Sequence, residues 1–259
     1  MRLEKGEATK LTTPQIENLL DLYAPPSGDR TRALRLWAEI REHEKLARLQ
    51  GNSKGFWQPY ADQVAPHFPH YLQLEADADH VTTHQLALVP GLLQTSDYRR
   101  ALARIEEPDL PGADTERRVE LATRRQAKLN EPGFTLEVFL SEAVLWNQPG
   151  GKPVMREQLE WLLMAGQRDN ISIRGIPFGT GSHKGLTIQS FTLLAFPNAP
   201  DGPVEPPVVY LEGALGALYH TRADVIDLYR TAIADLDAVA LDENGTRDMV
   251  SRVAKEFAE

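Results

Sequence analysis

The stretch FTLEVFLSEAVLW, residues 134–146, decides the fold class. Its apolar and polar residues alternate, and it is rich in the aromatic and branched side chains that favour a half-buried strand. The sequence predicts a helix next, at 153–166, with Pro153 in its first turn, and then a second strand, ISIRGIPF, at 171–178. This order, followed by further strands, predicts an α+β fold with a mixed or antiparallel sheet flanked by helices.

Two later segments extend the predicted sheet. LTIQSFTLLAFP, residues 186–197, is rich in β-formers, and PVVYLEGALGALYH, residues 207–220, predicts a strand, a glycine-marked bend and another strand. The run HVTTHQLALVP, residues 80–90, is also predicted to be extended. The remaining periodic segments predict helices at about 67–79, from Thr95 or Ser96 onward, and at about 115–130, 222–240 and 243–257.

The composition indicates a globular protein. The chain has 259 residues, of which 42% are hydrophobic, and this is enough for a substantial core. No run approaches the roughly 20 apolar residues of a membrane helix, and the N-terminus does not resemble a signal peptide, so we expect a cytoplasmic protein that does not enter a membrane. The sequence contains no cysteine, which excludes disulfides, thiol nucleophiles and zinc sites with cysteine ligands.

Charge and breaker residues divide the chain into three predicted parts. Residues 1–24 include an amphipathic helix at 14–23, residues 25–55 form a connecting helix and linker, and residues 56–259 form the main domain. The first 50 residues carry a net charge of +1 and the rest carry −10. Because an acidic surface repels phosphate, we do not expect the main domain to bind nucleic acid.

The candidate metal and catalytic motifs are weak. His80 and His84 have the spacing of a helical zinc motif, but on the predicted strand they would lie roughly 13 Å apart, too far to share one ion. The glycine-rich loop FGTGSHKG, residues 178–185, lacks the sequence of a phosphate-binding loop and that of a nucleophile elbow. The sequence therefore predicts no metal site, no cofactor and no catalytic residue.

A basic segment, ERRVELATRRQ, places arginines 117 and 124, and arginines 118 and 125, one heptad apart on a helix. We interpret them as a solvated face, with binding to an acidic partner as the alternative.

Two glutamates are the main candidates for recognition. Glu142 and Glu212 each occur in a run that otherwise resembles an apolar strand, and simple outward orientation is as good an explanation as function. If both face one cavity, each needs a hydrogen-bond donor, and His183 on the loop 178–185 would close over the strand ends. We therefore predict a ligand-binding site made of Glu142, His183 and Glu212, which recognises rather than hydrolyses.

The chain resembles the C-terminal domain of the WhiJ-like helix-turn-helix transcriptional regulators of actinobacteria, which belong to the XRE (Cro/C1-type) class. The likeness covers nearly all of residues 34–258, in order. It is carried by FWQPYADQVAPHFPHYLQLEADA, HQLALVPGLLQTSDYRRAL, ERRVELATRRQ, LSEAVLW, VMREQLEWLL, FGTGSHKGL, SFTLLAFP and VVYLEGALGALY. The combination of LVPGLLQT with the downstream FTLLAFP and VVYLEG is the specific part.

This resemblance implies that residues 1–24 are the remnant of a DNA-binding module. RLEKGE would be the end of its recognition helix and TPQIENLLDLY its fourth helix, so that the chain begins inside the module. A helix-turn-helix reads bases with the start of its recognition helix, which is missing here. Arg2 and Lys5 would contact phosphates at most, and we expect little specific DNA binding from this chain alone.

The resemblance implies regulation rather than catalysis. We expect a regulatory domain that senses a small molecule or a small partner protein from the same gene neighbourhood. It would reach DNA only through the missing helices. We also expect a homodimer among its assemblies. The alternative is a stand-alone small-molecule-binding protein or enzyme that has lost its DNA-binding domain.

Overall fold

The computed structural model describes residues 13–24, 26, 28–35, 37, 56, 58–65, 68–197, 205–214 and 216–257. The chain divides into two compact units, Met1–Phe56 and Trp57–Glu259. The boundary expected from the sequence, between residues 55 and 56, lies next to this division.

The first unit contains the predicted amphipathic helix, α1 (Thr13–Tyr23), none of whose residues is buried. Residues 28–35 and residue 37 are also helical. The two segments are joined by a hydrogen bond of 2.9 Å from Trp37 Nε1 to Thr13 Oγ1 and by an ion pair of 2.6 Å between Arg30 and Asp21. Arg2 and Lys5 of the expected remnant, and most other residues of the expected linker, lie outside the described residues.

Six strands in the described part of the second unit form one mixed sheet in the order β3-β2-β1-β4-β5-β6. β1, β2 and β3 are mutually parallel, whereas β4, β5 and β6 are added in antiparallel fashion. The strands are β1 (His80–Gln85), β2 (Thr135–Ser141), β3 (Ile171–Ile176), β4 (Phe191–Ala195), β5 (Val208–Gly213) and β6 (Gly216–His220).

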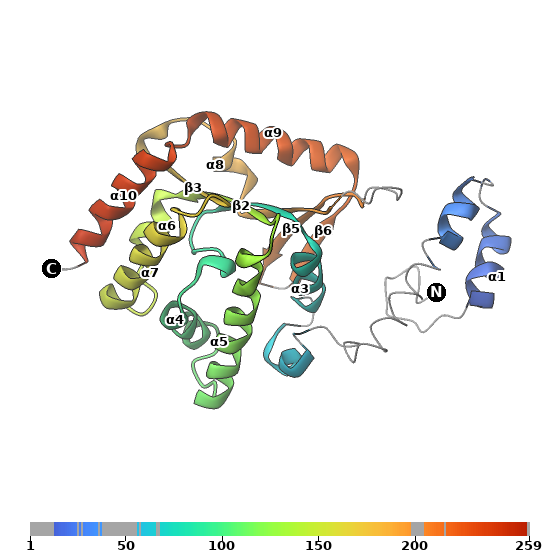
Figure 1. The fold of residues 1–259 in the computed structure, drawn as a ribbon, viewed down its shortest axis with the longest axis horizontal. Helices are drawn as coiled ribbons and strands as arrows, with labels where there is room; N and C mark the ends of the chain where they lie inside the picture. The colour runs from blue at the N-terminus through green and yellow to red at the C-terminus, as the bar shows by residue number, and fades with distance from the viewer. Residues whose placement is uncertain are drawn as a thin grey trace. The chain divides into compact units, whose positions relative to one another are not determined.

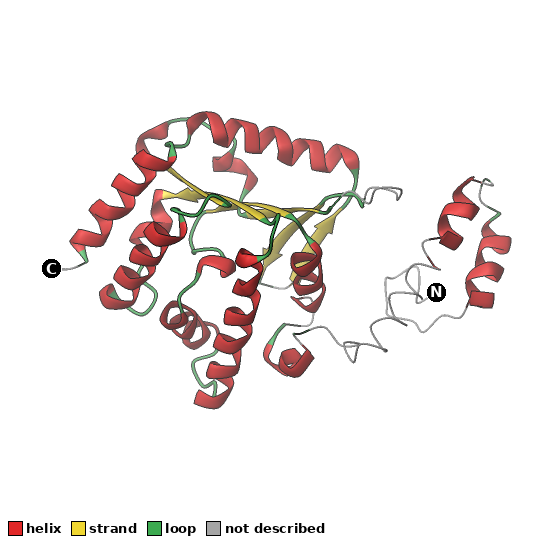
Figure 2. Ribbon diagram, in the orientation of Figure 1, coloured by secondary structure: helices red, strands yellow, loops and turns green. Residues whose placement is uncertain are grey.

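Helices cover both faces of this sheet (Figures 1 and 2). One face carries α3 (Phe68–Asp77), α4 (Ser96–Glu106), α5 (Gly112–Gln126) and α7 (Lys152–Ala165), and the other carries α9 (Ala223–Val239) and the short α8 (Gly185–Ile188). α10 (Glu243–Glu256) packs on α7 beside the edge strand β3. The 3-10 turns are η2 (Gln58–Gln63), η3 (Gly91–Leu93), η4 (Ala127–Asn130) and η5 (Phe178–Thr180).

The sheet has a core on each face because successive residues of a strand point to opposite faces. Val138 and Leu140 belong to the large core cluster beneath α3, α4 and α7, while Phe139 between them packs into the second cluster beneath α9. Tyr210 and Val209 divide in the same way. The predicted α+β class, with helices flanking a sheet, is therefore confirmed, and the sheet is mixed.

The prediction that residues 134–146 form one strand is wrong at its C-terminal end. β2 stops at Ser141, and Glu142–Trp146 form the short helix α6. The Ser141 hydroxyl accepts a hydrogen bond of 3.3 Å from the Ala143 amide and caps this helix, with Glu142 in its first turn. A serine cap and an acidic first turn both favour a helix start, and they outweigh the apolar pattern.

Candidate functional site

The second unit contains a cavity of about 690 Å³ between its helical layer and one end of the strands β1, β4 and β5. The wall includes the end of β1 at Gln85, the start of β4 at Phe191 and the end of β5 at Glu212. Because β1 and β5 run antiparallel to β4, these three positions lie at the same end of neighbouring strands. Residues of η2, α3, η3, α4 and α5 supply the rest of the wall.

A buried ion pair lies at the cavity wall, to which it contributes Arg125. Arg125 of α5 donates two hydrogen bonds to Glu75 of α3, of 2.8 Å from Nε to Oε1 and 2.9 Å from Nη2 to Oε2. The Tyr71 hydroxyl donates a third, of 2.8 Å, to Glu75 Oε2. The side chains of Arg125 and Glu75 are only 11% and 3% exposed. The guanidinium charge and three hydrogen bonds therefore compensate a carboxylate that would otherwise be costly to bury.

The surroundings fix the Arg125 guanidinium in place. It lies over the rings of Phe68 and Tyr71, at 5.2 and 5.7 Å from their centroids. A Cβ atom at Gly91 would lie 2.9 Å from Arg125 Nη2, so the glycine allows the backbone of η3 to approach the guanidinium closely. Burial alone would lower the pKa of Arg125, but the charge and hydrogen bonds of Glu75 outweigh burial and raise this pKa.

Three tyrosines lie between this ion pair and Glu212. The rings of Tyr71 and Tyr210 are 4.3 Å apart, and those of Tyr210 and Tyr219 are 5.2 Å apart. Burial, and then the charge of Glu212, raise the pKa of Tyr210, so its hydroxyl is a donor at neutral pH. Burial raises the pKa of Tyr219 to about 12. Glu212 is therefore close to hydroxyl groups, and its negative charge also helps to raise the pKa of Arg125.

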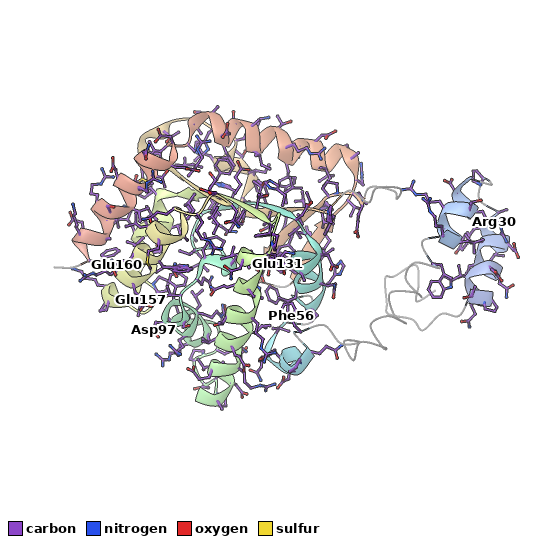
Figure 3. The ribbon with its side chains drawn as sticks, in the orientation of Figure 1. Arg30, Phe56, Asp97, Glu131, Glu157 and Glu160 are labelled. Carbon is purple, nitrogen blue, oxygen red and sulfur yellow. The ribbon has the colours of Figure 1, made fainter. Side chains whose placement is uncertain are left out.

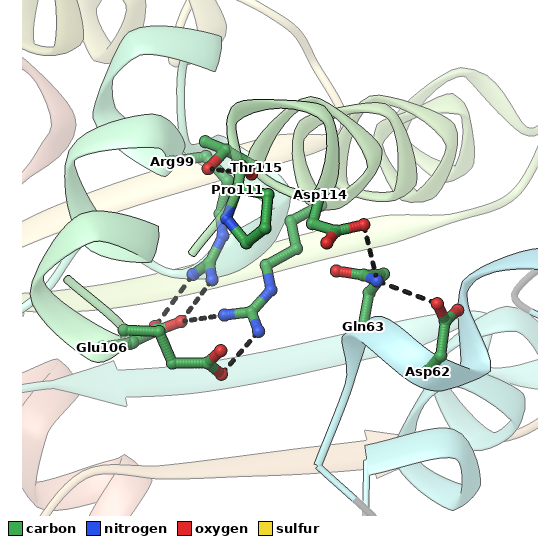
Figure 4. A network of polar contacts seen from close by, with 9 residues as sticks. Asp62, Gln63, Arg99, Glu106, Pro111, Asp114 and Thr115 are labelled. Atoms are coloured by element: carbon green, nitrogen blue, oxygen red, sulfur yellow. Dashed lines mark hydrogen bonds and ion pairs between the residues drawn. The ribbon is translucent and has the colours of Figure 1, made fainter. Parts of the chain in front are cut away.

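A second cluster of charges lines the cavity between α4 and α5 (Figure 4). Arg99 donates to both oxygens of Glu106, at 3.1 and 2.6 Å. Arg118 donates to Glu106 at 3.5 Å and to Glu107 at 2.5 Å. The side chain of Arg118 is only 11% exposed. These four residues join the C-terminal end of α4 to the first half of α5.

The turn η2 is attached to α5 by polar contacts. Gln63 Nε2 donates to Asp62 at 2.9 Å and to Asp114 at 3.0 Å, as Figure 4 shows. Arg117 donates to both Asp62 oxygens, at 2.6 and 2.7 Å, and its hydrogen bonds hold the pKa of Asp62 at about 2. Tyr60, 3% exposed, packs with residues of α3 and α5 in a separate small core. Any movement of α5 should therefore be transmitted to η2.

The three residues predicted to form one site do not line one cavity. Glu212 lines the cavity described above, and Glu142 and His183 do not. Glu142 follows β2, whereas Glu212 ends β5, and β1 and β4 lie between these strands. Three strand spacings of about 4.8 Å separate them by about 14 Å. The expectation of a single pocket is therefore wrong, although the separate ligand-binding role of each residue stays a prediction.

Glu142 has structural partners instead. It is 9% exposed, accepts hydrogen bonds from the Phe178 amide at 3.0 Å and from Trp146 Nε1 at 3.3 Å, and lies 3.6 Å from Arg252 of α10. The expectation that a buried carboxylate needs donors is confirmed here. Glu142 joins η5, α6 and α10.

His183 lies beneath the other helical layer. A Cβ atom at Gly185 would meet the ring of His183 at 2.8 Å and Leu236 of α9 at 2.6 Å. The fully buried His84 is near, with its Nε2 3.4 Å from the Gly185 carbonyl oxygen. Burial lowers the pKa of His84, and the charge of His183 lowers it further. His84 therefore stays neutral at physiological pH.

No group of three or more potential metal-ligating side chains occurs among the described residues. The side chain of His80 bonds instead to the hydroxyls of Thr135, at 2.6 Å, and Thr82, at 3.0 Å. Arg2 and Lys5, the residues expected to contact DNA, lie outside the described part of the chain.

The interpretation of the arginines of α5 as one solvated face is wrong for Arg118 and Arg125, which enter the cavity wall. Arg124, 50% exposed, does face solvent. A sequence signal for Arg125 existed, because it follows Leu121 and Ala122 at i+4 and i+3 and so shares their helix face. Glu75 follows Tyr71 in the same way.

A family model described as domain of unknown function (DUF5753) matches residues 68–252. No curated protein and no solved structure matches the chain. The family match covers more than half of the chain, which therefore belongs to this family. None of the helices in the described ranges has both the length and the apolar character needed to cross a membrane.

Proposed function

We propose that this member of the DUF5753 family is the regulatory part of a helix-turn-helix transcriptional regulator, and that the cavity beside Arg125 is where it senses a ligand. The observation that carries the proposal is a cavity of about 690 Å³ whose wall combines apolar side chains with positioned charged groups. Pockets of this size and lining are typical of small-molecule sites. The sequence resemblance supplies the regulatory context, and a cytoplasmic location is part of the proposal.

A sensor also needs a connection from its ligand to the part that responds. The turn η2 supports the proposal because it lines the cavity through Asp62 and Gln63 and begins directly after the division at Phe56. Polar contacts between η2 and α5 would carry a shift of the cavity wall to the start of the second unit. A ligand acts in this way only if it binds one arrangement of the wall better than another.

The DNA-related part of the proposal concerns the first unit. DNA contact would depend on the recognition helix that the resemblance implies, with at most phosphate contacts from Arg2 and Lys5. A small partner protein from the same gene neighbourhood and a homodimer are further proposed assemblies. The alternative, a stand-alone ligand-binding protein or enzyme, uses the same cavity, and DNA binding by the complete regulator separates the two.

A ligand screen on the full chain tests the sensing role. We would measure thermal unfolding with a library of small polar and amphipathic molecules, on the wild type and on Ala122→Phe, which fills the cavity from α5. Ala234→Phe, the same change at an exposed position of α9, is the matched control. Ligands that stabilise the wild type and Ala234→Phe, but not Ala122→Phe, support the proposal.

Hydrogen exchange then tests the connection. A cavity ligand should increase the protection of residues 58–63 as well as that of the cavity wall. A ligand that protects α4 and α5 but leaves η2 unchanged would reject the proposed path, and a screen without any ligand sensitive to Ala122→Phe would reject the sensing role.

A further inference from the structure

We propose that the cavity binds an uncharged ligand that carries a carboxamide group at one end of an elongated apolar body. The inference rests on the proposed function, because it names the class of ligand for the same cavity. It is drawn from three polar atoms of the wall that are buried without a hydrogen-bond partner in the described part of the chain. They are Oε1 of Gln63, Nε of Arg118 and the hydroxyl of Tyr210.

The Gln63 oxygen is an acceptor whose position is fixed by the other end of its amide. Nε2 donates to Asp62 and Asp114, at 2.9 and 3.0 Å, and the reversed orientation would bring Oε1 against both carboxylates. Oε1 is therefore turned away from Asp62, toward the side of Glu106 in Figure 4. Gln63 is 8% exposed and belongs to the cavity wall, so this oxygen requires a donor from the cavity.

The Arg118 Nε is a donor at the same end of the cavity. Arg118 follows Asp114 by four residues on α5, and helical side chains lean toward the N-terminus of their helix. Arg118 therefore extends over the turn of α5 where Gln63 binds Asp114. Its Nη1 and Nη2 donate to Glu106 and Glu107, whereas Nε is buried with no acceptor among the described residues. One acceptor and one donor thus await a ligand side by side.

A neutral carboxamide meets both requirements, and a charged group does not. A cation supplies donors for Gln63 but has no acceptor for Arg118. An anion supplies acceptors for Arg118 but has no donor for Gln63, and it would lie among the carboxylates that already bind these two side chains. A carboxamide offers an N–H and a C=O in one uncharged group, and it leaves the ion pairs of Arg118 intact.

The length of the ligand follows from the path of the cavity along α5. The wall residues of this helix are spaced i, i+4, i+7, i+8 and i+11, and so lie on one of its faces: Asp114, Arg118, Leu121, Ala122 and Arg125. At 1.5 Å per residue, the distance along the helix from Asp114 to Arg125 is about 16 Å. An elongated ligand fits such a path better than a compact one.

The middle and the far end of the cavity fit the body of this ligand. The wall includes Leu102, Leu121 and Phe191, and covering such side chains would contribute the hydrophobic part of the binding energy. At the far end the ring of Tyr71 contacts both Arg125 and the ring of Tyr210. Tyr210 is 5% exposed, and its hydroxyl would bind a polar group at the distal end of a longer ligand.

Four probes with the same phenylalkyl body test the ligand class on the full chain. Isothermal titration calorimetry should show 6-phenylhexanamide binding about tenfold more tightly than each of three analogues, because each analogue leaves a buried wall atom without a partner. The analogues are N,N-dimethyl-6-phenylhexanamide, which has no donor, 6-phenylhexanoate, an anion, and 6-phenylhexylamine, a cation. Since the two amides are uncharged, the ratio of their affinities should not depend on ionic strength.

Variants of the two wall residues localise the effect. Gln63→Met removes the acceptor and should weaken 6-phenylhexanamide about tenfold but leave the dimethylamide unchanged. Gln73→Met is the matched control, because Gln73 is exposed on α3 outside the cavity wall and its Nε2 also binds an aspartate, so both affinities should stay unchanged. Arg118→Lys keeps the charge without Nε and should weaken both amides. Ala122→Phe should abolish the binding of all four probes, and thermal unfolding without ligand verifies that each variant is folded.

The outcomes distinguish this inference from the proposed function. Equal or tighter binding of any analogue would overturn the carboxamide class. A preference for 6-phenylhexanamide that persists in Gln63→Met, or amide affinities unchanged in Arg118→Lys, would overturn it as well, because these wall atoms would then be satisfied by water. Failure of 6-phenylhexanamide to bind, when the screen finds other ligands sensitive to Ala122→Phe, would overturn the class but leave the sensing role intact. A screen without any such ligand would overturn both.

Discussion

Replacing Glu75 with glutamine tests how the cavity wall is held together. The substitution keeps the shape of the side chain and removes its charge, so that Arg125 remains 11% exposed without an anion in contact. Removing one partner of a buried ion pair costs about 3–5 kcal/mol. The glutamine oxygen still accepts one hydrogen bond, so we expect the lower end of this range, about 3 kcal/mol, or a decrease in Tm of roughly 6–12 °C.

Urea unfolding followed by circular dichroism measures this loss, provided that the m-value stays unchanged. The matched control is Glu160→Gln, which breaks an exposed pair with Arg156 on α7 and should cost less than about 0.5 kcal/mol (Figure 3). The double variant Glu75→Leu with Arg125→Met should recover at least half of the loss, because two apolar side chains need no partner. The remainder arises because the Tyr71 hydroxyl loses its acceptor.

Two results would refute this reasoning. If Glu75→Gln lowers the free energy of unfolding no more than Glu160→Gln does, burial gives the Glu75–Arg125 pair no additional contribution to stability. If the double variant is as unstable as Glu75→Gln, the loss comes from packing of the side chains rather than from an uncompensated charge.

Four further predictions concern other parts of the molecule. Because burial holds the pKa of His84 below 6.5, the unfolded chain takes up this proton first as the pH falls, so stability should decrease below about pH 6.5, and His84→Gln should flatten this part of a urea-unfolding profile. A carbon NMR titration should give Asp62 a pKa of about 2, and Arg117→Gln should return it toward 3.8; an unchanged value would exclude the Arg117 contact as its cause. Gly150→Ala should cost about 2–4 kcal/mol in thermal unfolding, because φ is +79° there and the new Cβ would lie 2.9 Å from that of Ala101. Fluorescence anisotropy should show no sequence-specific DNA binding by this chain, and a dissociation constant near ~10⁻⁸ M for one sequence would contradict that expectation.

The sequence was sufficient to predict most elements of the sheet and its helices. Strands such as β5 and β6 follow from alternation and a glycine bend, and the start of α4 follows from Thr95, whose side chain does cap the helix. Strand order was not predictable, because it depends on contacts between distant segments. The mixed sheet arises where β4 pairs antiparallel with β1, which precedes it by more than 100 residues.

The candidate site was harder to predict for a physical reason. Glu142 and Glu75 are both acidic residues within apolar patterns, and only their partners distinguish them. The donors to Glu142 include a backbone amide, at Phe178, which no side-chain pattern reveals. The donor to Glu75 is Arg125, 50 residues later, on a helix whose charged residues outnumber its apolar ones. Helical spacing placed Arg125 beside Leu121, but the abundance of charge favoured a solvated face.

Three of the four arginines of α5 divide between two roles, and this division links the cavity to η2. Arg118 and Arg125 point into the cavity wall, where they bind carboxylates of α4 and α3. Arg117 lies one residue before Arg118, a rotation of about 100° around the helix, and binds Asp62 of η2. A ligand that competes with Arg118 or Arg125 for their carboxylates would displace a side chain that is only 11% exposed, and we expect α5 to shift with it. The same displacement changes the position of Arg117, so the contact with η2 and the occupancy of the cavity are coupled through one rigid helix.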